Sequence, residues 1–291
     1  GSILGNSRQP FKKINDYDKS GNTKVQSMIN NYSEMKLDCI VVLGGNGSHK
    51  TANLLREKGL NVVTLPKTID NDINGTEMTF GFQSAMDIAT KTLEQLHTTA
   101  KTHKRIIVDE IMGNKAGWLT LYSGLAGEAD IILIPEIPYS IDKIEQFINK
   151  KLKEGRRHIM IAAAEGIISQ EEAKLSKKEL KKKRKEENYT SAAKYLEKKL
   201  SGRVDREIRA VVPGHIQRGG SPNSFDKALT LQLGSKAAEL ILNKKYGRMV
   251  AVVNNKITSV PLSVAVEKPK RVSPNDEIVK QARMMGICLG D

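Results

Sequence analysis

Residues 39–72 read CIVVLGGNGSHKTANLLREKGLNVVTLPKTIDND, and this stretch decides the fold class. Two short apolar runs, Cys39–Leu43 and Asn61–Leu65, have the length and the valine and isoleucine content of buried strands. Between them, apolar side chains recur at helical spacing. The order strand, helix, strand predicts parallel strands joined by a helical crossover.

The same alternation continues along the rest of the chain. Helical stripes run from Val25 to Met35 and from Phe82 to Leu96. Five further apolar runs are expected to form buried strands: Arg105–Met112, Asp130–Pro135, His158–Ala164, Glu207–Val212 and Met249–Val253. The pattern predicts an α/β fold whose parallel sheets are covered by helices on both faces and bind ligands at the carboxyl ends of their strands.

The composition restricts the class of protein. The 291 residues suffice for one large or two modest domains, and 39% hydrophobic residues exclude collagen-like and disordered chains. No run of about 18 apolar residues predicts a membrane span. Cys39 and Cys288 match no metal spacing, so we expect a reducing, cytoplasmic location. The 47 Lys and Arg against 33 Asp and Glu give a net charge of +14, which favours an anionic ligand.

One stretch, residues 170–203, differs in charge from the alternating strands and helices, and we call it the Lys-rich insertion. It carries twelve Lys or Arg against six Glu. It is interpreted either as an arm that binds nucleic acid or another polyanion, or as a solvated, partly helical insertion. Because no recognised nucleic-acid-binding motif accompanies the lysines, we favour the second interpretation and expect no nucleic-acid partner.

Two loops that follow predicted strands carry chemistry. In residues 44–48, GGNGS, the glycines let backbone amides approach a phosphate at a helix N-terminus, although a tight structural turn has the same pattern. In residues 66–72, PKTIDND, one aspartate is suited to accept the proton of a substrate hydroxyl and a second to help hold Mg²⁺. The alternative for the second loop is a helix cap and turn.

Five segments together resemble the phosphofructokinase family, in family order and spacing over nearly the whole chain: GGNGS at 44–48, PKTIDND at 66–72, TFGFQSA at 79–85, IMG at 111–113 and GHIQRGGSP at 214–222. The resemblance implies two Rossmann-like domains with the active site in the cleft between them. It also implies phosphoryl transfer from ATP to the 1-hydroxyl of fructose 6-phosphate in glycolysis, with Mg²⁺ as cofactor.

The resemblance assigns roles to single residues. Asp70 matches the general base, Asp72 its neighbour that positions the reacting groups, and Thr68 the hydroxyl near the transferred phosphoryl group. The matching sugar-phosphate residues are Met112, Gly113 and Glu165 for the fructose ring and His215 and Arg218 for the 6-phosphate. Arg105 and Arg209 match arginines that reach the 6-phosphate from a neighbouring subunit, which implies a homo-oligomer, usually a tetramer.

For three of these residues a structural interpretation is the alternative to the functional one. His215 could be a histidine of the core, Glu165 a helix cap and Arg105 a partner in a surface ion pair.

The phosphoryl donor is implied by a second set of matches. The donor-binding positions are Arg8, Gly45, Asn46, Gly47, Ser48 and Lys67. Gly47 resembles the ATP-using branch, and Lys67 resembles the pyrophosphate-using branch. We favour ATP because a glycine leaves the donor pocket open at this position, and pyrophosphate stays the alternative.

Three departures from the family pattern bear on activity. Asn46 stands where most relatives have an aspartate that helps bind Mg²⁺, which makes it a weak metal ligand. Asn114 replaces a common arginine. The first strand of the family, with its GGDxxGxN-type loop, has no counterpart, and Gly1 resembles a start inside the family sequence. A non-catalytic, sugar-phosphate-binding regulatory homologue is therefore a further alternative.

The resemblance also predicts the domain boundaries. Residues 1–81 and 217–268 are expected to form the donor-binding domain. Residues 82–216 and 269–291, with the Lys-rich insertion, are expected to form the sugar-phosphate-binding domain.

Overall fold

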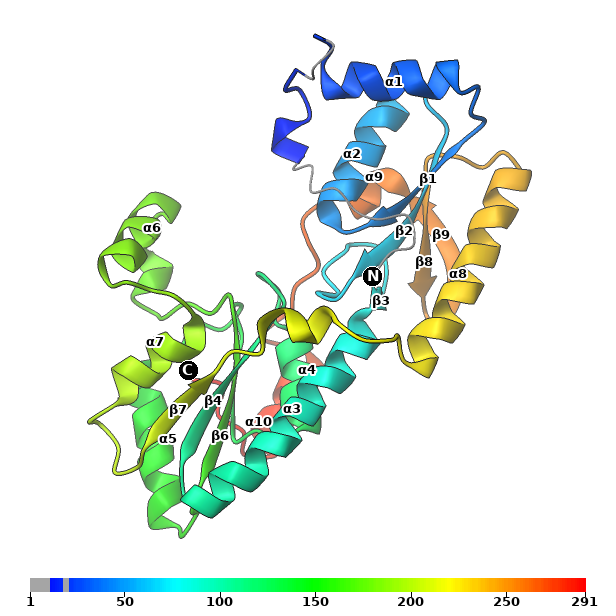
Figure 1. The fold of residues 1–291 in the computed structure, drawn as a ribbon. Coiled ribbons are helices and arrows are strands. Elements are labelled where there is room, and N and C mark those ends of the chain that lie inside the picture. Colours follow the sequence, from blue (N-terminus) through cyan, green and yellow to red (C-terminus); the bar gives the residue numbers. More distant parts are fainter. Residues whose placement is uncertain (1–10, 18–20) are drawn as a thin grey trace. The chain divides into compact units, whose positions relative to one another are not determined.

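The computed structural model describes residues 11–17 and 21–291, and these form two compact units (Figure 1). Unit 1 comprises the described residues up to Phe82 together with Pro222–Lys270. Unit 2 comprises Gln83–Ser221 and Arg271–Asp291. Each unit has its own sheet and its own hydrophobic core, so each is described by itself.

Unit 1 is built around a sheet with the strand order β1-β2-β8-β9, and β3 also pairs with β2. Its strands are β1 (Ile40–Gly44), β2 (Val62–Thr68), β3 (Phe80–Gly81), β8 (Arg248–Val253) and β9 (Lys256–Pro261). Its helices are η1 (Phe11–Lys13), α1 (Lys24–Glu34), α2 (Asn46–Glu57), α8 (Ser224–Leu242) and α9 (Leu262–Ala265). All pairs are parallel except β8 with β9.

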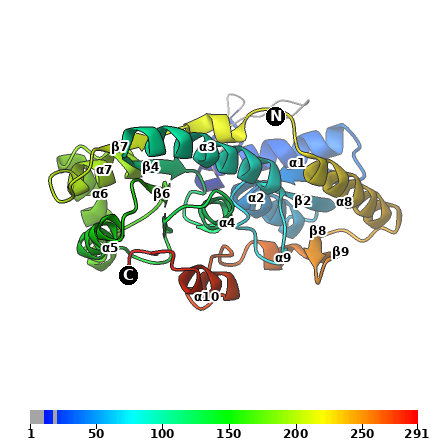
Figure 2. The same ribbon diagram turned by 90° about the horizontal axis from the view of Figure 1, so that it is seen from below.

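Two hydrophobic clusters cover the two faces of this sheet. On one face, Val62 and Met249 pack with side chains of α1, α2 and α9. On the other face, Val63 and Val250 pack against Leu233 and its neighbours on α8. In the view of Figure 2, β2 accordingly lies between α2 and α8. The alternate residues of the strands thus face two different helical layers, as a buried parallel sheet requires.

Unit 2 contains a parallel sheet with the order β5-β6-β4-β7. Its strands are β4 (Ile106–Ile111), β5 (Ile131–Leu133), β6 (Ile159–Ala164) and β7 (Ile208–Val211). Its helices are α3 (Phe82–His103), α4 (Trp118–Ala126), α5 (Ile141–Lys153), η2 (Glu172–Lys174), α6 (Lys177–Glu186), α7 (Ala192–Leu200), η3 (Gly214–Arg218) and α10 (Glu277–Met284). Every residue of β6 is buried, which is typical of a central strand with both faces covered.

Glycine at one position sets the distance between a helix and this sheet. A Cβ atom added to Gly124 of α4 would lie 2.9 Å from Cδ1 of Ile132 and 3.1 Å from Cβ of Ala162. A larger residue would therefore push α4 away from β5 and β6, and close packing at protein density would be lost.

The predicted α/β class is confirmed, and each of the seven predicted strands forms. Strands β3 and β9 were not predicted from the sequence. The β8–β9 hairpin turns at Asn254 and Asn255, whose φ angles are 51° and 57°, a left-handed pair that suits a two-residue hairpin. It was missed because polar residues interrupt the apolar ones in β9 and none of its residues is buried, so it lacks the apolar run used to find the other strands.

The Lys-rich insertion is only partly solvated, which corrects the expectation for it. Every side chain of α6 is at least partly exposed, and α6 stands out from the body of unit 2 in Figure 1. In contrast, Ala193, Leu196 and Leu200 of α7 are buried in the core of unit 2 because they recur on one helix face. Among the described residues, no helix is both long and apolar enough to cross a membrane.

Candidate active site

The glycine-rich loop of residues 44–48 forms the junction between β1 and α2 in unit 1. Helix α2 begins at Asn46, two residues after β1 ends at Gly44. A Cβ atom on Gly44 would lie 2.2 Å from Oγ of Ser48, so the turn requires glycine there. The first amides of a helix have no acceptor within it, and the helix dipole favours negative charge at this end. The junction therefore suits a phosphate group.

Two glycines of this loop differ in their surroundings. A Cβ atom added to Gly47 would meet no atom of the described chain within 4 Å, so the space beside this residue is open. A Cβ atom on Gly45 would lie 3.8 Å from Cβ of Thr68 and 4.0 Å from the carbonyl oxygen of Lys67. The loop therefore lies against the end of β2, where the predicted acid–base residues begin.

A hydrogen bond joins the two predicted motifs directly. The Asn46 amide Nδ2 donates to Oδ2 of Asp72 across 2.6 Å, and Asp72 is only 8% exposed. The backbone amide of Asp70 donates to Oγ1 of Thr68 across 3.2 Å. The structure thus brings Asn46, Thr68, Asp70 and Asp72 together, and we call this group with residues 44–48 the β1–β2 site.

The shape of the loop after β2 depends on residues that the sequence analysis did not select. Asn71 has a φ angle of 49°, which asparagine tolerates better than most residues. Its Oδ1 accepts from the amide of Thr79 at 3.0 Å, and its Nδ2 donates to the carbonyl of Glu77 at 3.2 Å. Oγ1 of Thr79 in turn donates to the carbonyl of Thr68 at 2.9 Å. These bonds close the loop and orient the aspartates on either side of Asn71.

Lys270 is a further member of the β1–β2 site that was missed. Its Nζ donates to the carbonyls of Thr76 and Glu77, each at 2.9 Å, and its amide donates to the carbonyl of Asp72 at 2.9 Å. Burial lowers the pKa of Lys270 to about 8, against the opposite effect of the Asp72 and Glu77 charges. No sequence signal marks this lysine, because 194 positions separate it from Thr76.

The oxygen atoms of the β1–β2 site bear on Mg²⁺ binding. Asp72 and the amide of Asn46 offer a carboxylate and a carbonyl, which are ligand types that Mg²⁺ accepts. Within the described ranges, no group of three or more His, Cys, Asp or Glu is arranged to hold a metal ion. The residues therefore fit an ion that is held mainly by substrate phosphates and water, with few protein ligands.

Unit 2 contains a second group at the carboxyl ends of β4 and β6. Oε1 of Glu165 accepts from the amides of Gly113 at 3.2 Å and Asn114 at 2.7 Å. A Cβ atom on Gly166 would lie 1.9 Å from the carbonyl oxygen of Asn114, so the two loops are in direct contact. We call Met112, Gly113, Glu165 and the adjoining η3 the β4–β6 site. Glu165 caps the loop after β4 and not a helix, which corrects the alternative considered for it.

Gln217 attaches η3 to this site and was also missed. It is 1% exposed, its Oε1 accepts from the amide of Met112 and its Nε2 donates to the carbonyl of Glu110, both at 2.9 Å. His215 and Arg218, on the same short helix, are exposed. The core-histidine alternative for His215 is therefore wrong. The signal that was overlooked is a glutamine between the two predicted phosphate ligands in GHIQRGG.

The two remaining arginines lie elsewhere in unit 2. Arg105 immediately precedes β4 and Arg209 is the second residue of β7, and both form ion pairs with Glu207. The six residues of β4 span about 20 Å, so Arg105 and Met112 lie at opposite ends of the strand. Within one chain these arginines are therefore not part of the β4–β6 site. Arg8 lies outside the described residues.

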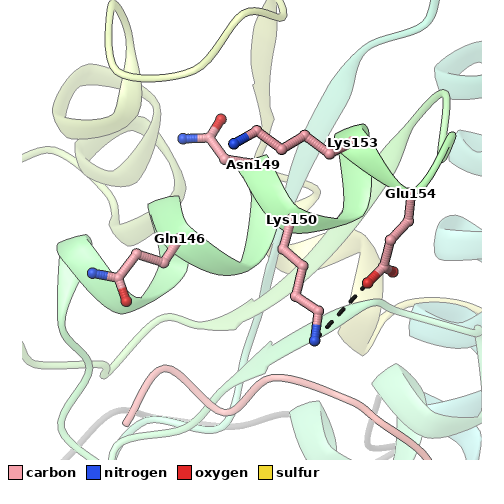
Figure 3. Close-up of a pocket in the computed structure, with 5 residues that line it drawn as sticks. All are labelled: Gln146, Asn149, Lys150, Lys153 and Glu154. Atoms are coloured by element: carbon pink, nitrogen blue, oxygen red, sulfur yellow. Dashed lines mark ion pairs between the residues drawn. The ribbon is translucent and has the colours of Figure 1, made fainter.

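A hollow on the surface of unit 2 contains none of these residues. Figure 3 shows that it is lined by Gln146, Asn149, Lys150, Lys153 and Glu154, which come from α5 and its C-terminal end. Lys150 points toward Glu154, with 3.9 Å between Nζ and Oε1. Side chains from one exposed helix face do not converge on a ligand as the loops after β1 and β2 do, so the β1–β2 and β4–β6 sites are the stronger candidates.

Comparisons with known proteins agree with the motifs. The sequence model described as Phosphofructokinase matches residues 1–241. The chain is 46% identical to a Spirochaeta thermophila protein named ATP-dependent 6-phosphofructokinase, over 100% of this chain and 80% of that protein. It is 44% identical to a Bacteroides thetaiotaomicron protein named ATP-dependent 6-phosphofructokinase 3, over 100% of this chain and 81% of the relative.

A solved structure is similar in fold. It is named a pyrophosphate-dependent phosphofructokinase from Marinobacter aquaeolei, and the TM-score is 0.77 over 100% of this chain and 75% of that chain. Because the sequence identity is 18%, this likeness bears on the fold alone. It agrees with the α/β architecture described above.

Proposed function

Because the chain belongs to the phosphofructokinase family, we propose that it transfers the γ-phosphoryl group of ATP to the 1-hydroxyl of fructose 6-phosphate, a step of glycolysis. The products are fructose 1,6-bisphosphate and ADP. The observation that carries the proposal is the hydrogen bond between Asn46 and Asp72, since it joins the phosphate loop to the acid–base loop. Phosphate binding and proton transfer are thereby available at one place in the fold.

In this proposal the β1–β2 site binds the donor and holds the base. Asp70 accepts the proton of the 1-hydroxyl as that oxygen attacks phosphorus, and Thr68 lies beside the transferred group. Asp72 and the Asn46 carbonyl would hold Mg²⁺, which supplies positive charge to the donor phosphates. Gly45, Gly47 and Ser48 contribute backbone amides, while Arg8 and Lys67 contribute positive charge.

The β4–β6 site is proposed to bind fructose 6-phosphate. Met112, Gly113 and Glu165 would hold the ring, and the exposed His215 and Arg218 would bind the 6-phosphate. Arg105 and Arg209 are proposed to serve the site of a neighbouring copy in a homotetramer. Their position at the amino ends of β4 and β7, away from Met112, supports a role outside their own chain's site.

ATP is proposed as the donor in preference to pyrophosphate. The open space beside Gly47 supports this choice, because a nucleotide needs room that pyrophosphate does not. We further propose that the enzyme acts in the cytoplasm, with small phosphorylated metabolites and no nucleic acid or membrane as its partners.

The proposal is tested by the formation of fructose 1,6-bisphosphate from fructose 6-phosphate and Mg²⁺ with either ATP or pyrophosphate. Asp70→Asn is expected to lower kcat with ATP by about a thousandfold, because the general base is lost. Asp38→Asn is the matched control, since Asp38 is an exposed aspartate of the same unit, and it should leave kcat unchanged.

Other outcomes would point to the alternatives. Turnover with pyrophosphate and not with ATP would show that Lys67, and not Gly47, indicates the phosphoryl donor. Binding of fructose 6-phosphate without turnover of either donor would favour a regulatory homologue.

A further inference from the structure

One arginine of the Lys-rich insertion differs from its neighbours on α6. The side chain of Arg184 is 21% exposed, whereas Lys181, Lys182 and Lys185 are exposed. Its Nε donates to Oε1 of Glu172 at 2.8 Å, and its Nη2 donates to Oε2 of Glu172 at 3.0 Å. The guanidinium therefore holds this carboxylate through both oxygens, which is the strongest geometry for such a pair.

The same guanidinium reaches the loop after β6. Nη2 of Arg184 also donates to the carbonyl oxygen of Ile167 at 2.8 Å. Ile167 is two residues after Glu165 and is 2% exposed. Cζ of Arg184 lies over the ring of Tyr189, 4.2 Å from the ring centroid, which is a cation–π contact. Arg184 is thus fixed on several sides while it contacts the segment that carries Glu165.

Glu172 connects the pair to the same segment a second time. It is 2% exposed, and its Oε2 accepts from the amide of Ser169 at 3.0 Å. The amide of Glu172 donates in return to Oγ of Ser169 at 3.1 Å. Residues 165–169 are therefore held at Ile167 by Arg184 and at Ser169 by Glu172, and a shift of either partner would move the loop.

We propose that Arg184 is a positioning residue for Glu165 and thereby for the binding of fructose 6-phosphate, an inference that rests on the proposed function of the β4–β6 site. Glu165 holds Gly113 and Asn114 through single hydrogen bonds of 3.2 and 2.7 Å, so a small displacement of its backbone breaks them. The Lys-rich insertion would then act on sugar-phosphate affinity through one internal arginine and not through its exposed lysines.

The test compares two substitutions on α6 in steady-state kinetics. Arg184→Lys keeps the positive charge but cannot hold both Glu172 oxygens and the Ile167 carbonyl, and it is expected to raise KM for fructose 6-phosphate about five- to tenfold. KM for ATP and kcat should stay within about twofold, because the β1–β2 site is in the other unit. Lys181→Gln, an exposed lysine on the same helix, should change none of these values.

Since Glu172 is buried, loss of its partner also threatens folding. The double variant Glu172→Gln with Arg184→Gln removes the buried charges together, and it should keep the thermal midpoint closer to that of the parent protein while KM for the sugar phosphate still rises. A calorimetric titration with fructose 6-phosphate gives the affinity independently of turnover.

Each result decides between the explanations. An unchanged KM for fructose 6-phosphate in folded Arg184→Lys would overturn the inference, as would an equal rise in both KM values, which indicates general loss of structure. Glu165→Gln tests the proposed β4–β6 site separately from the proposed role of Arg184. If it raises KM for the sugar phosphate and Arg184→Lys does not, the inference is wrong and the proposed function stands. If Glu165→Gln also has no effect, the assignment of the β4–β6 site is wrong.

Discussion

The β1–β2 and β4–β6 sites are built in different ways. The β1–β2 site takes its main residues from one stretch, 44–72, in which two adjacent parallel strands end side by side. The β4–β6 site gathers residues from 112 to 218, and its loops are held by side chains that bond to backbone groups, chiefly Glu165 and Gln217. A site of the second kind depends on a few side chains that brace its loops, and one of them, Gln217, has no proposed contact with substrate.

The largest expected difference is between Gly166, which follows Glu165 of the β4–β6 site, and Gly47 of the β1–β2 site. Gly166→Ala should lower the free energy of unfolding by about 3 kcal/mol or more, because its Cβ would lie 1.9 Å from the Asn114 carbonyl oxygen. Gly47→Ala should not lower stability, because its Cβ meets open space and alanine favours the helix. Urea unfolding of the two variants makes the comparison. Equal stability of the two variants would show that the loops of the β4–β6 site can move apart to accommodate the added methyl group at little cost in free energy.

Buried carboxylates give a second contrast. Asp72 accepts from Asn46, whereas neither oxygen of Asp109 in β4 has a hydrogen-bond partner among the described residues. Burial raises the pKa of Asp109 from 3.8 to about 8, with a smaller contribution from Glu110. Between these pKa values the folded chain holds a proton that the unfolded chain releases, so this group makes stability fall as the pH rises.

Asp109→Asn removes this titration. Relative to the variant, the parent protein should lose on the order of 3 kcal/mol of stability between pH 5 and pH 8. Denaturant unfolding at several pH values measures the difference. Asp142→Asn is the control, since the side chain of Asp142 is 75% exposed. Parallel pH profiles for Asp109→Asn and the parent protein would show that the buried carboxyl does not titrate in this range.

Substitution of Gln217 tests directly whether side chains that bond to the loops of the β4–β6 site support its function. Gln217→Ala deletes two buried hydrogen bonds, to Met112 and Glu110, and should cost about 2 kcal/mol of stability. Since it frees η3, KM for fructose 6-phosphate should rise about tenfold while KM for ATP stays constant. Gln232→Ala, at an exposed position of α8, is the control. A change in KM for ATP alone would contradict the assignment of η3 to sugar-phosphate binding.

The smallest effect is expected at Asn46, which is proposed to contribute to Mg²⁺ binding. Asn46→Asp places a second carboxylate 2.6 Å from Asp72, which repels it in the absence of metal but adds a charged ligand for Mg²⁺. The Mg²⁺ concentration for half-maximal activity should fall about threefold. Asn31→Asp, on the exposed side of α1, controls for the added charge. A higher Mg²⁺ requirement in Asn46→Asp would show that the amide of Asn46 suits the site better than a carboxylate.

The sequence by itself determined the α/β class and the loops of the β1–β2 site. Seven strands were predicted because each is a short apolar run, and residues 44–48 and 66–72 were found because their chemistry is contiguous in the chain. Strand β9 was not predicted, because polar residues interrupt its apolar ones and none of its residues is buried, so it has no continuous apolar run.

Only the tertiary structure decided which residues support the sites. The amide of Lys270 bonds to the carbonyl of Asp72 and the side chain of Gln217 to the carbonyl of Glu110, and both partners are far away in the sequence. Arg184 bonds to Glu172 and Ile167, which are nearer in the sequence but are not paired with it by any local pattern. Periodicity and motifs contain information only about residues that are close to one another in the sequence. A buried polar group is satisfied by whatever the fold places beside it, and that depends on the packing of the whole unit.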